Sequence, residues 1–234
     1  QATALLCTPS YALRLAEVAR ENHIDPASLE VRRVIVAGEP GGSVPAVRRQ
    51  IESSWNALVI DHAGASEIGP WGYGDKAGHG LFVVENEFIA EFLSLATGRA
   101  ATDGELAELV LTSLGRHGSP VIRYRTGDIV RPRFMPREEN HFTLLEGGVL
   151  GRADDMLIVR GVNIFPSSIE QIVRAFPEVV EFRVTAVRHG SLDALVVEIE
   201  DRLNTPERIA RELQLRLGLK VDVKTVTLGS LPRF

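Results

Sequence analysis

The spacing of apolar residues over the first 60 positions switches between the helical period and the strand period. Thr8 and Pro9 have the residue types of a helix N-cap and first turn. The continuous β-branched run at 32–39 is typical of a strand that is buried on both faces. Together the patterns predict a helix, a strand, a helix and a strand at residues 10–23, 32–39, 43–55 and 57–61. A strand–helix–strand unit of this kind favours a parallel sheet.

The pattern changes in the middle of the chain. Short apolar runs separated by turn residues predict strands at 80–93, 105–114, 121–132 and 141–147. The segment 61–75 is rich in small residues and is predicted to be a loop at the edge of the sheet. We therefore expect a mostly antiparallel sheet or a small barrel appended to the parallel unit.

A third pattern follows Gly151. Ser167 and Glu170 have the spacing of a capping box, and Thr205 and Gly218 bracket a second helix. Strands are predicted at 156–159, 181–190, 193–201 and 220–228. The order β-α-β-β-α-β predicts a small ferredoxin-like α+β domain.

These patterns predict an α/β fold with two domains. The first, at 1–150, joins a parallel α/β unit to a small antiparallel sheet or barrel, and the second, at 151–234, is the small α+β domain. The strand at 195–201 could offer an exposed edge to a partner, so an oligomer stays open.

Composition narrows the function classes. The chain has 234 residues, 44% of them hydrophobic, which is enough for one large domain or two modest ones. A net charge of -5 disfavours nucleic-acid binding, which needs a basic face. The apolar runs are too short to span a membrane. The single cysteine excludes a disulfide framework and fits a reducing, cytoplasmic location. Because the chain starts without Met, we expect it to be a processed or excised piece.

The first candidate site is the turn 37–43, between a strand and a helix. Glu39 would repel a phosphate and Pro40 has no N–H to donate, so a phosphate cradle is disfavoured. The turn could still line a neutral ring with its backbone, at the carboxyl end of a parallel strand. A plain Gly-rich turn is an equally good interpretation.

Two further candidates are polar residues in loops. The Ser66 hydroxyl could donate to a phosphate and Glu67 could bind Mg²⁺, although an ordinary surface loop explains both. Asp128 could accept hydrogen bonds from two ribose hydroxyls, and its commoner role is turn formation. His62 and His79 lack a recognisable zinc-ligand spacing.

Asp154 and Asp155 are adjacent carboxylates at the predicted boundary. Neighbours in an extended chain point to opposite sides, so they cannot easily share a metal or form a coupled acid/base pair. A turn or joint between the domains is the better interpretation.

Five segments stand in this order along the chain: "TPSYALRLAEVARE", "GEP", "GASEIGP", "SPVIRYRTGDI" and "GRADDMLIVRGVNIFPSSIE". In combination they resemble the phenylacetate–coenzyme A ligases of the adenylate-forming superfamily. The resemblance runs from about Thr8 to Phe234 and corresponds to the second half of a typical member. It implies the C-terminal part of the large AMP-binding domain at 1–150 and the C-terminal lid domain at 151–234.

The resemblance also implies a reaction. ATP with Mg²⁺ adenylates an aromatic carboxylic acid, the lid rotates, and coenzyme A then forms the thioester. The implied positions are Gly38, Glu39 and Pro40 beside adenine, Ala63 at a position that is usually aromatic and packs on adenine, Ser66 near phosphate, Glu67 on Mg²⁺, Asp128 on the ribose, Arg152 on ribose or phosphate, Asp154 at the lid hinge, and Arg160, Gly161 and Asn163 beside the pantetheine tunnel.

The chain departs from the resemblance at both ends. It has no upstream phosphate loop and stops at "LPRF", before the lysine that such enzymes use in adenylation. We therefore expect a fragment that does not adenylate alone. Two alternatives stay open: a ligase that passes the acyl group to an amine or a carrier protein, and a non-catalytic nucleotide- or CoA-binding relative.

Overall fold

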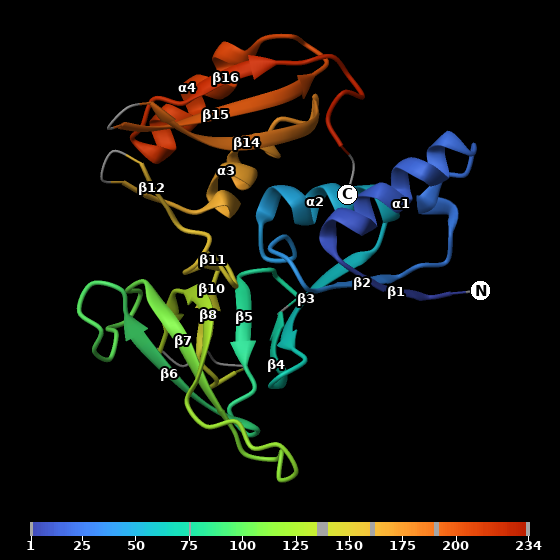
Figure 1. Cartoon of the computed structure of the whole chain (residues 1–234). Helices are drawn as coiled ribbons and strands as arrows, with labels where there is room; N and C mark the ends of the chain where they lie inside the picture. The colour runs from blue at the N-terminus through green and yellow to red at the C-terminus, as the bar shows by residue number, and fades with distance from the viewer. Residues whose placement is uncertain (1, 75, 135–139, 160–161, 190–191, 233–234) are drawn as a thin grey trace. The chain divides into compact units, whose positions relative to one another are not determined.

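The computed structural model describes residues 2–74, 76–134, 140–159, 162–189 and 192–232. The chain divides into two compact units, Gln1–Asp154 and Asp155–Phe234, shown from blue to yellow and from yellow to red in Figure 1. The sequence patterns placed a boundary after residue 150, and the observed division falls after Asp154.

The first unit is built around a mixed seven-stranded sheet in the order β1-β2-β3-β4-β5-β10-β9. Its parallel part joins β1 to β2 and β2 to β3, and its remaining pairs are antiparallel. A second, antiparallel sheet has the order β11-β8-β7-β6. The α/β class, with a parallel unit followed by antiparallel strands, is confirmed. The elements are β1 Ala4–Cys7, α1 Pro9–Glu21, η1 Pro26–Ser28, β2 Arg33–Val36, α2 Pro45–Trp55, β3 Leu58–Ala65, β4 Gly69–Gly74, β5 Gly80–Val83, β6 Phe88–Ser94, β7 Ala107–Ser113, β8 Tyr124–Val130, β9 Pro132–Arg133, β10 Leu144–Glu146 and β11 Gly151–Arg152.

The start of α1 follows directly from its sequence. The Thr8 hydroxyl accepts a hydrogen bond from the Tyr11 N–H at 3.3 Å, as its N-cap position predicts. Strand β2 is shorter than predicted, and only Val34 and Val36 are fully buried while Arg33 is exposed. The prediction that this strand is buried on both faces is therefore wrong.

The predicted loop at 61–75 forms a β-hairpin over its described residues, 61–74. Strand β3 continues to Ala65, and β4 returns antiparallel from Gly69 after a tight turn. Ile68 and Trp71 are buried in the core of this unit. The small residues that suggested a loop serve close packing, because a Cβ on Gly72 would lie 3.2 Å from the Ala63 Cβ.

The second unit holds a three-stranded sheet, β14-β15-β16, and a separate pair, β12-β13. Among the described residues β12 pairs with β13 and not with the larger sheet, so the ferredoxin-like four-stranded sheet does not form. Strand β15 pairs with β14 and with β16 over Val196–Ile199, so the edge proposed for a partner is not free. The elements are β12 Leu157–Val159, β13 Val162–Ile164, α3 Pro166–Val173, β14 Val179–His189, β15 Leu192–Asp201, α4 Pro206–Leu217 and β16 Asp222–Thr225.

The helix ends of the second unit correct one prediction and confirm another. The N-cap of α3 is Phe165, with Pro166 at the first helical position, so Ser167 is inside the helix and the capping box is wrong. Helix α4 ends at Gly218, which adopts the left-handed conformation (φ 65°) as predicted. None of the described helices is both long and apolar enough to cross a membrane.

Candidate functional site

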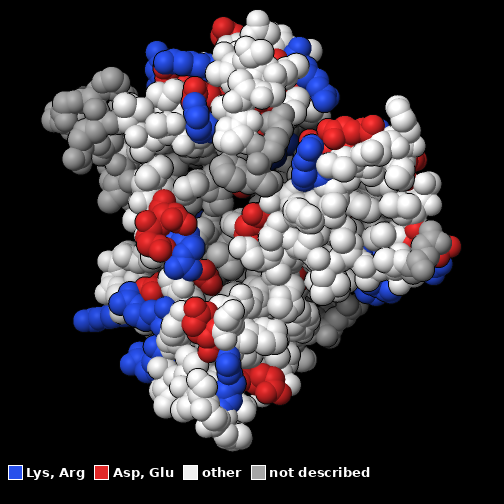
Figure 2. Space-filling model, turned by 45° about the vertical axis from the view of Figure 1, so that its right-hand side comes forward, with Lys and Arg blue, Asp and Glu red and all other residues white. Residues whose placement is uncertain are grey.

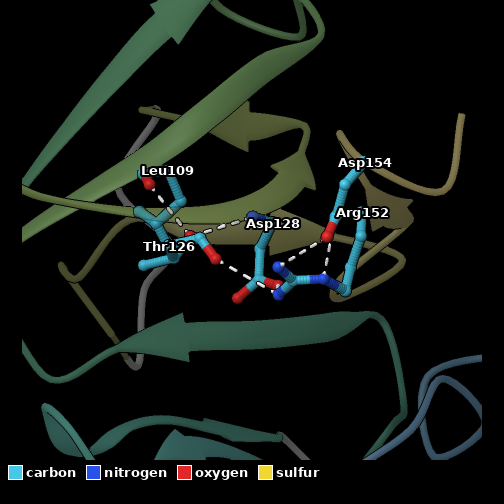
Figure 3. A network of polar contacts seen from close by, with 5 residues as sticks. All are labelled: Leu109, Thr126, Asp128, Arg152 and Asp154. Atoms are coloured by element: carbon cyan, nitrogen blue, oxygen red, sulfur yellow. Dashed lines mark hydrogen bonds and ion pairs between the residues drawn. The ribbon is translucent and has the colours of Figure 1, made fainter.

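The candidate site of the first unit centres on the pairing of β8 with β11, which sets Arg152 opposite Asp128 (Figure 3). The Arg152 guanidinium donates from Nη1 to the Asp128 Oδ1 at 3.4 Å and to the Thr126 carbonyl at 3.2 Å. Its Nε and Nη2 donate to the two Asp154 oxygens at 3.0 and 3.3 Å. One arginine thus joins two carboxylates, and Asp154 pairs with it rather than with Asp155.

Thr126 fixes the backbone in front of Asp128. Its buried hydroxyl donates to the Leu109 carbonyl at 2.9 Å and accepts from the Asp128 N–H at 3.0 Å. Asp128 lies within β8, so the interpretation as a plain turn former is wrong for this residue. The carboxylate is held by strand pairing and presented beside the Arg152 guanidinium.

Burial gives Asp128 unusual acid–base behaviour. Its side chain is 18% exposed, and loss of solvation raises its pKa to about 6 even though the charge of Arg152 acts in the opposite direction. Asp154 is exposed, and the hydrogen bonds from Arg152 lower its pKa. The two carboxylates therefore differ in charge state near pH 5, where Asp154 stays ionised.

A substitution at Gly127 tests how much the close contact between its backbone and the Arg152 side chain matters for stability. It has a φ of +76°, and a Cβ there would lie 2.9 Å from the Arg152 Nη2. We expect Gly127→Ala to lower the free energy of unfolding by about 1–2 kcal/mol, and by more than Gly98→Ala, because an L side chain is unfavourable at positive φ and its Cβ would also displace the Arg152 guanidinium. Chemical denaturation measures this. Gly98→Ala is the matched control for φ alone (+68°), since no atom lies within 4 Å of its Cβ position. Equal losses in the two variants would show that the Arg152 contact contributes nothing.

The turn after β2 is tied to helix α1. The Glu39 carboxylate accepts a hydrogen bond from the Ser10 N–H at 2.6 Å, at the N-terminus of a 13-residue helix. The positive end of the helix dipole favours this negative charge. Glu39 therefore has a structural partner, while Gly38 and Pro40 can contact a ligand through their backbone.

Ser66 and Glu67 lie in the exposed turn between β3 and β4. Arg116 holds this turn by donating from Nη1 to the Glu67 carbonyl at 2.8 Å and to the Ser66 carbonyl at 3.3 Å. Among the described residues no three His, Cys, Asp or Glu side chains gather closely enough to hold a metal by themselves. A Mg²⁺ ion at Glu67 would thus take its other ligands from phosphate oxygens and water, which is its usual habit.

The remaining predicted positions are less informative. Ala63 lies in β3 and is only 8% exposed, with its side chain in the core of the unit. Arg160 and Gly161 lie outside the described residues. Asn163 is described only by its backbone, which pairs with Ile158 in the β12-β13 ladder. The structure thus brings Asp128, Arg152 and Asp154 together. Arg160 and Gly161 are not among the described residues.

Charges of both signs are interspersed on the face of the molecule drawn in Figure 2. Several of them form local pairs, such as Arg133 with Asp103 at 3.2 Å and Arg14 with Glu17 at 3.0 Å. Exposed pairs of this kind contribute little to stability. The partly buried Asp128 next to Arg152 is therefore the more informative charge pair.

One polar pair was missed from the sequence. The Ser43 hydroxyl donates to the buried Asp61 carboxylate at 2.5 Å. The sequence patterns place Ser43 at the start of a helix and Asp61 at the end of a strand. The two residues are 18 positions apart, and only the parallel pairing of β2 with β3 brings them together.

Comparison with known proteins identifies relatives of this chain among the CoA ligases. Residues 161–234 match the family model of the AMP-binding enzyme C-terminal domain. A phenylacetate-coenzyme A ligase of Pseudomonas putida is 33% identical over 98% of this chain and 54% of its own length. One from Thermus thermophilus is 31% identical over 97% of this chain and 57% of its own length. The chain thus spans about half the length of these relatives.

Solved structures of related enzymes are also matched over about half of their length. A crystal structure of 2-hydroxyisobutyryl-CoA ligase superposes with a TM-score of 0.92 at 29% identity, over 99% of this chain and 52% of that one. An amide bond synthetase from Marinactinospora thermotolerans, at 20% identity and a TM-score of 0.69, shares the fold. The resemblance carried by the sequence motifs is confirmed: along nearly its whole length, this chain is related to the C-terminal half of the phenylacetate–coenzyme A ligases among the adenylate-forming enzymes.

Proposed function

We propose that this chain is the C-terminal half of an acyl-CoA ligase. A carboxylate oxygen of an aromatic acid attacks the α-phosphorus of ATP, which releases pyrophosphate and leaves an acyl-adenylate. The coenzyme A thiolate then attacks the acyl carbon and AMP leaves. The observation that carries the proposal is the Asp128–Arg152–Asp154 network, in a chain about one third identical to phenylacetate-coenzyme A ligases.

In the first unit, the proposed roles follow the chemistry of each group. Ionised Asp128 accepts hydrogen bonds from the two ribose hydroxyls, and Arg152 donates to ribose or phosphate oxygen. The backbone of the turn 38–40 faces the adenine, and Ala63 lies on the neighbouring strand. The Ser66 hydroxyl donates to a phosphate oxygen, which is a weaker contact than a charged one.

Magnesium has a defined place in this proposal. Glu67 would hold the ion together with phosphate oxygens and water, and the ion would neutralise charge on the leaving pyrophosphate. The exposure of the turn and its attachment through Arg116 support this role, because a hydrated ion needs an accessible and fixed carboxylate.

The second unit is proposed to be the lid. Adenylation and thioester formation need different groups beside the same acyl carbon, and rotation of a small domain supplies both in turn. The division of the chain directly after Asp154 supports that residue as the hinge. Arg160, Gly161 and Asn163 are proposed to face the pantetheine arm of coenzyme A.

The experiment uses the full-length ligase that contains this chain. We expect ATP–pyrophosphate exchange that depends on an aromatic carboxylic acid, and AMP plus acyl-CoA when coenzyme A is added. Exchange at background across a panel of aromatic acids would overturn the proposal. The isolated 234-residue chain is expected to show no exchange, and measurable exchange by it would contradict its assignment as half an enzyme.

The acyl acceptor is identified by analysing the products of the same full-length enzyme. Ala63 stands where the resemblance implies an aromatic residue, and this departure leaves an amine or carrier-protein acceptor as the second candidate. Product analysis with coenzyme A, amines and carrier proteins as competing acceptors separates them. An amide product formed faster than the thioester would replace the CoA ligase proposal.

A further inference from the structure

A buried serine–aspartate pair lies beneath the proposed nucleotide turn. The Ser43 Oγ donates to the Asp61 Oδ2 at 2.5 Å, and the His62 N–H donates to the Asp61 Oδ1 at 3.0 Å. Ser43 is 5% exposed and Asp61 is 7% exposed. The pair joins the turn after β2 to the middle of β3, and neither residue has a role in the proposed chemistry.

Glycines from three segments close around this pair. A Cβ on Gly42 would lie 2.5 Å from the Asp61 Cγ, and one on Gly74 would lie 2.9 Å from the Asp61 backbone nitrogen. A Cβ on Gly148 would lie 3.0 Å from the Ser43 Oγ. The backbone therefore approaches the pair as closely as it can, and no side chain fits between them.

Arg48 also holds the same turn. It is 7% exposed and donates from Nη1 to the Gly42 carbonyl at 3.4 Å and from Nη2 to the Lys76 carbonyl at 2.9 Å. Its Nε lies 3.1 Å from a Glu52 carboxylate oxygen. Gly42 is thus fixed between an arginine from α2 and the Ser43–Asp61 bond.

These contacts link two segments that the proposed function uses separately. The turn 38–42 precedes Ser43 directly, and β3, which carries Asp61, continues to Ala65 just before the turn of Ser66 and Glu67. A shift of Ser43 against β3 would change the distance between the two segments. A misplacement of about 1 Å is enough to weaken binding and catalysis.

We infer that Ser43 and Asp61 form a positioning pair that holds the proposed adenine-binding turn in register with β3, the strand that leads into the turn of the proposed phosphate and metal residues. This inference rests on the proposed function. The pair acts through the backbone of residues 38–42 and makes no contact with the nucleotide. It adds to the site a positioning contact that the motif residues alone do not contain.

The test compares Ser43→Ala with Ser94→Ala in the 234-residue chain. Ser94 is also buried and its hydroxyl is bonded to the Glu105 carboxylate, so the control loses the same kind of bond away from the turn. We expect Ser43→Ala to speed amide hydrogen exchange in 38–42 about fivefold and to raise the Kd for AMP about fivefold, the effect of one lost hydrogen bond. Ser94→Ala should change neither.

Asp61→Asn is the conservative variant. An asparagine can accept from the His62 N–H with its oxygen and donate from its nitrogen to the Ser43 hydroxyl, so the turn should keep most of its exchange protection. Unchanged exchange in 38–42 after Ser43→Ala, or an equal rise in the Kd for AMP after Ser94→Ala, would overturn the positioning inference. Failure of the unaltered chain to bind AMP would instead count against the proposed function, while the exchange data still decide whether the pair positions the turn.

Discussion

Asp128→Ala is expected to raise the Kd for AMP about a hundredfold at pH 7.5, because two hydrogen bonds to a charged acceptor contribute about 3 kcal/mol together. The proposed acceptor is held in place by the Thr126 hydroxyl and by Arg152, so it needs no reorganisation to meet the ribose. Calorimetric titration of the 234-residue chain with AMP measures the loss.

The pH dependence of the unaltered chain follows from the same carboxyl group. Its pKa is raised to about 6 by burial, so the ionised acceptor is lost as the pH falls through 6. If only the ionised form binds the ribose, the Kd for AMP should rise about tenfold between pH 7 and pH 5. Asp128→Asn should remove the part of this pH dependence that comes from the carboxyl group, and the part that comes from the AMP phosphate, whose second pKa is about 6, should remain.

The contribution of Asp128 to the free energy of unfolding should change with pH in the opposite direction to its contribution to AMP affinity. A carboxyl group whose pKa is higher in the folded state stabilises the fold below its unfolded value of 3.8, and this contribution is lost as the pH rises through about 6. Asp128→Asn is therefore expected to raise the free energy of unfolding at pH 7.5, by at most about 3 kcal/mol, and to have little effect at pH 3. AMP binding thus needs the ionised form of Asp128, while burial in the fold favours its protonated form.

Asp103→Ala is the matched control for these measurements. Asp103 also pairs with an arginine, Arg133, at 3.2 Å, and it lies outside the proposed site. AMP affinity within about twofold of the unaltered chain is expected for this control. If Asp128→Ala binds AMP as well as the control does, the ribose assignment is wrong.

Glu67→Gln in the full-length ligase should lower the rate of acyl-adenylate formation about a hundredfold or more, because a metal ion at the transferred phosphate contributes several kcal/mol to transition-state stabilisation. An amide oxygen binds Mg²⁺ more weakly than a carboxylate, so the variant should also need more Mg²⁺ to reach its maximal rate. Pyrophosphate exchange at a series of Mg²⁺ concentrations measures both effects.

A measurement of AMP binding without metal shows whether Glu67→Gln loses the Mg²⁺ ligand or misfolds. Glu67 lies in an exposed turn, so the variant should bind AMP and melt as the unaltered enzyme does. Glu30→Gln, at another exposed position, is the control for loss of one negative charge. A Mg²⁺ requirement that stays the same in Glu67→Gln would remove Glu67 from the metal site.

Local sequence signals predicted most of the elements. Thr8 and Pro9 begin α1, Gly218 ends α4, and the alternation around 181–201 forms the β14-β15 hairpin. Each of these signals acts within a few residues, through a cap, a left-handed glycine or side-chain alternation. Such features depend on residues that are close together in the sequence, so they can be predicted without knowledge of distant contacts.

The wrong predictions have two causes, packing across a sheet and the position of a proline. The small residues of β3 and β4 suggested a loop, yet Trp71 and Ile68 pack into the core and the glycines permit close strand pairing. Ser167 and Glu170 have the spacing of a capping box, but Pro166 starts α3 two positions before the first residue of the helix that this box predicts. Propensity is a weak prior where packing across a sheet or a proline decides the geometry.

The sequence by itself determined the helical and strand periods, the Thr126–Gly127–Asp128 motif and the resemblance that pointed to nucleotide chemistry. Only the tertiary structure decided which polar groups meet. Arg152 stands opposite Asp128 because β11 pairs with β8 in one register, and a shift of one residue would turn its side chain to the other face. The Glu39–Ser10 and Ser43–Asp61 bonds likewise join residues 29 and 18 positions apart, a separation over which local sequence carries no information about contact.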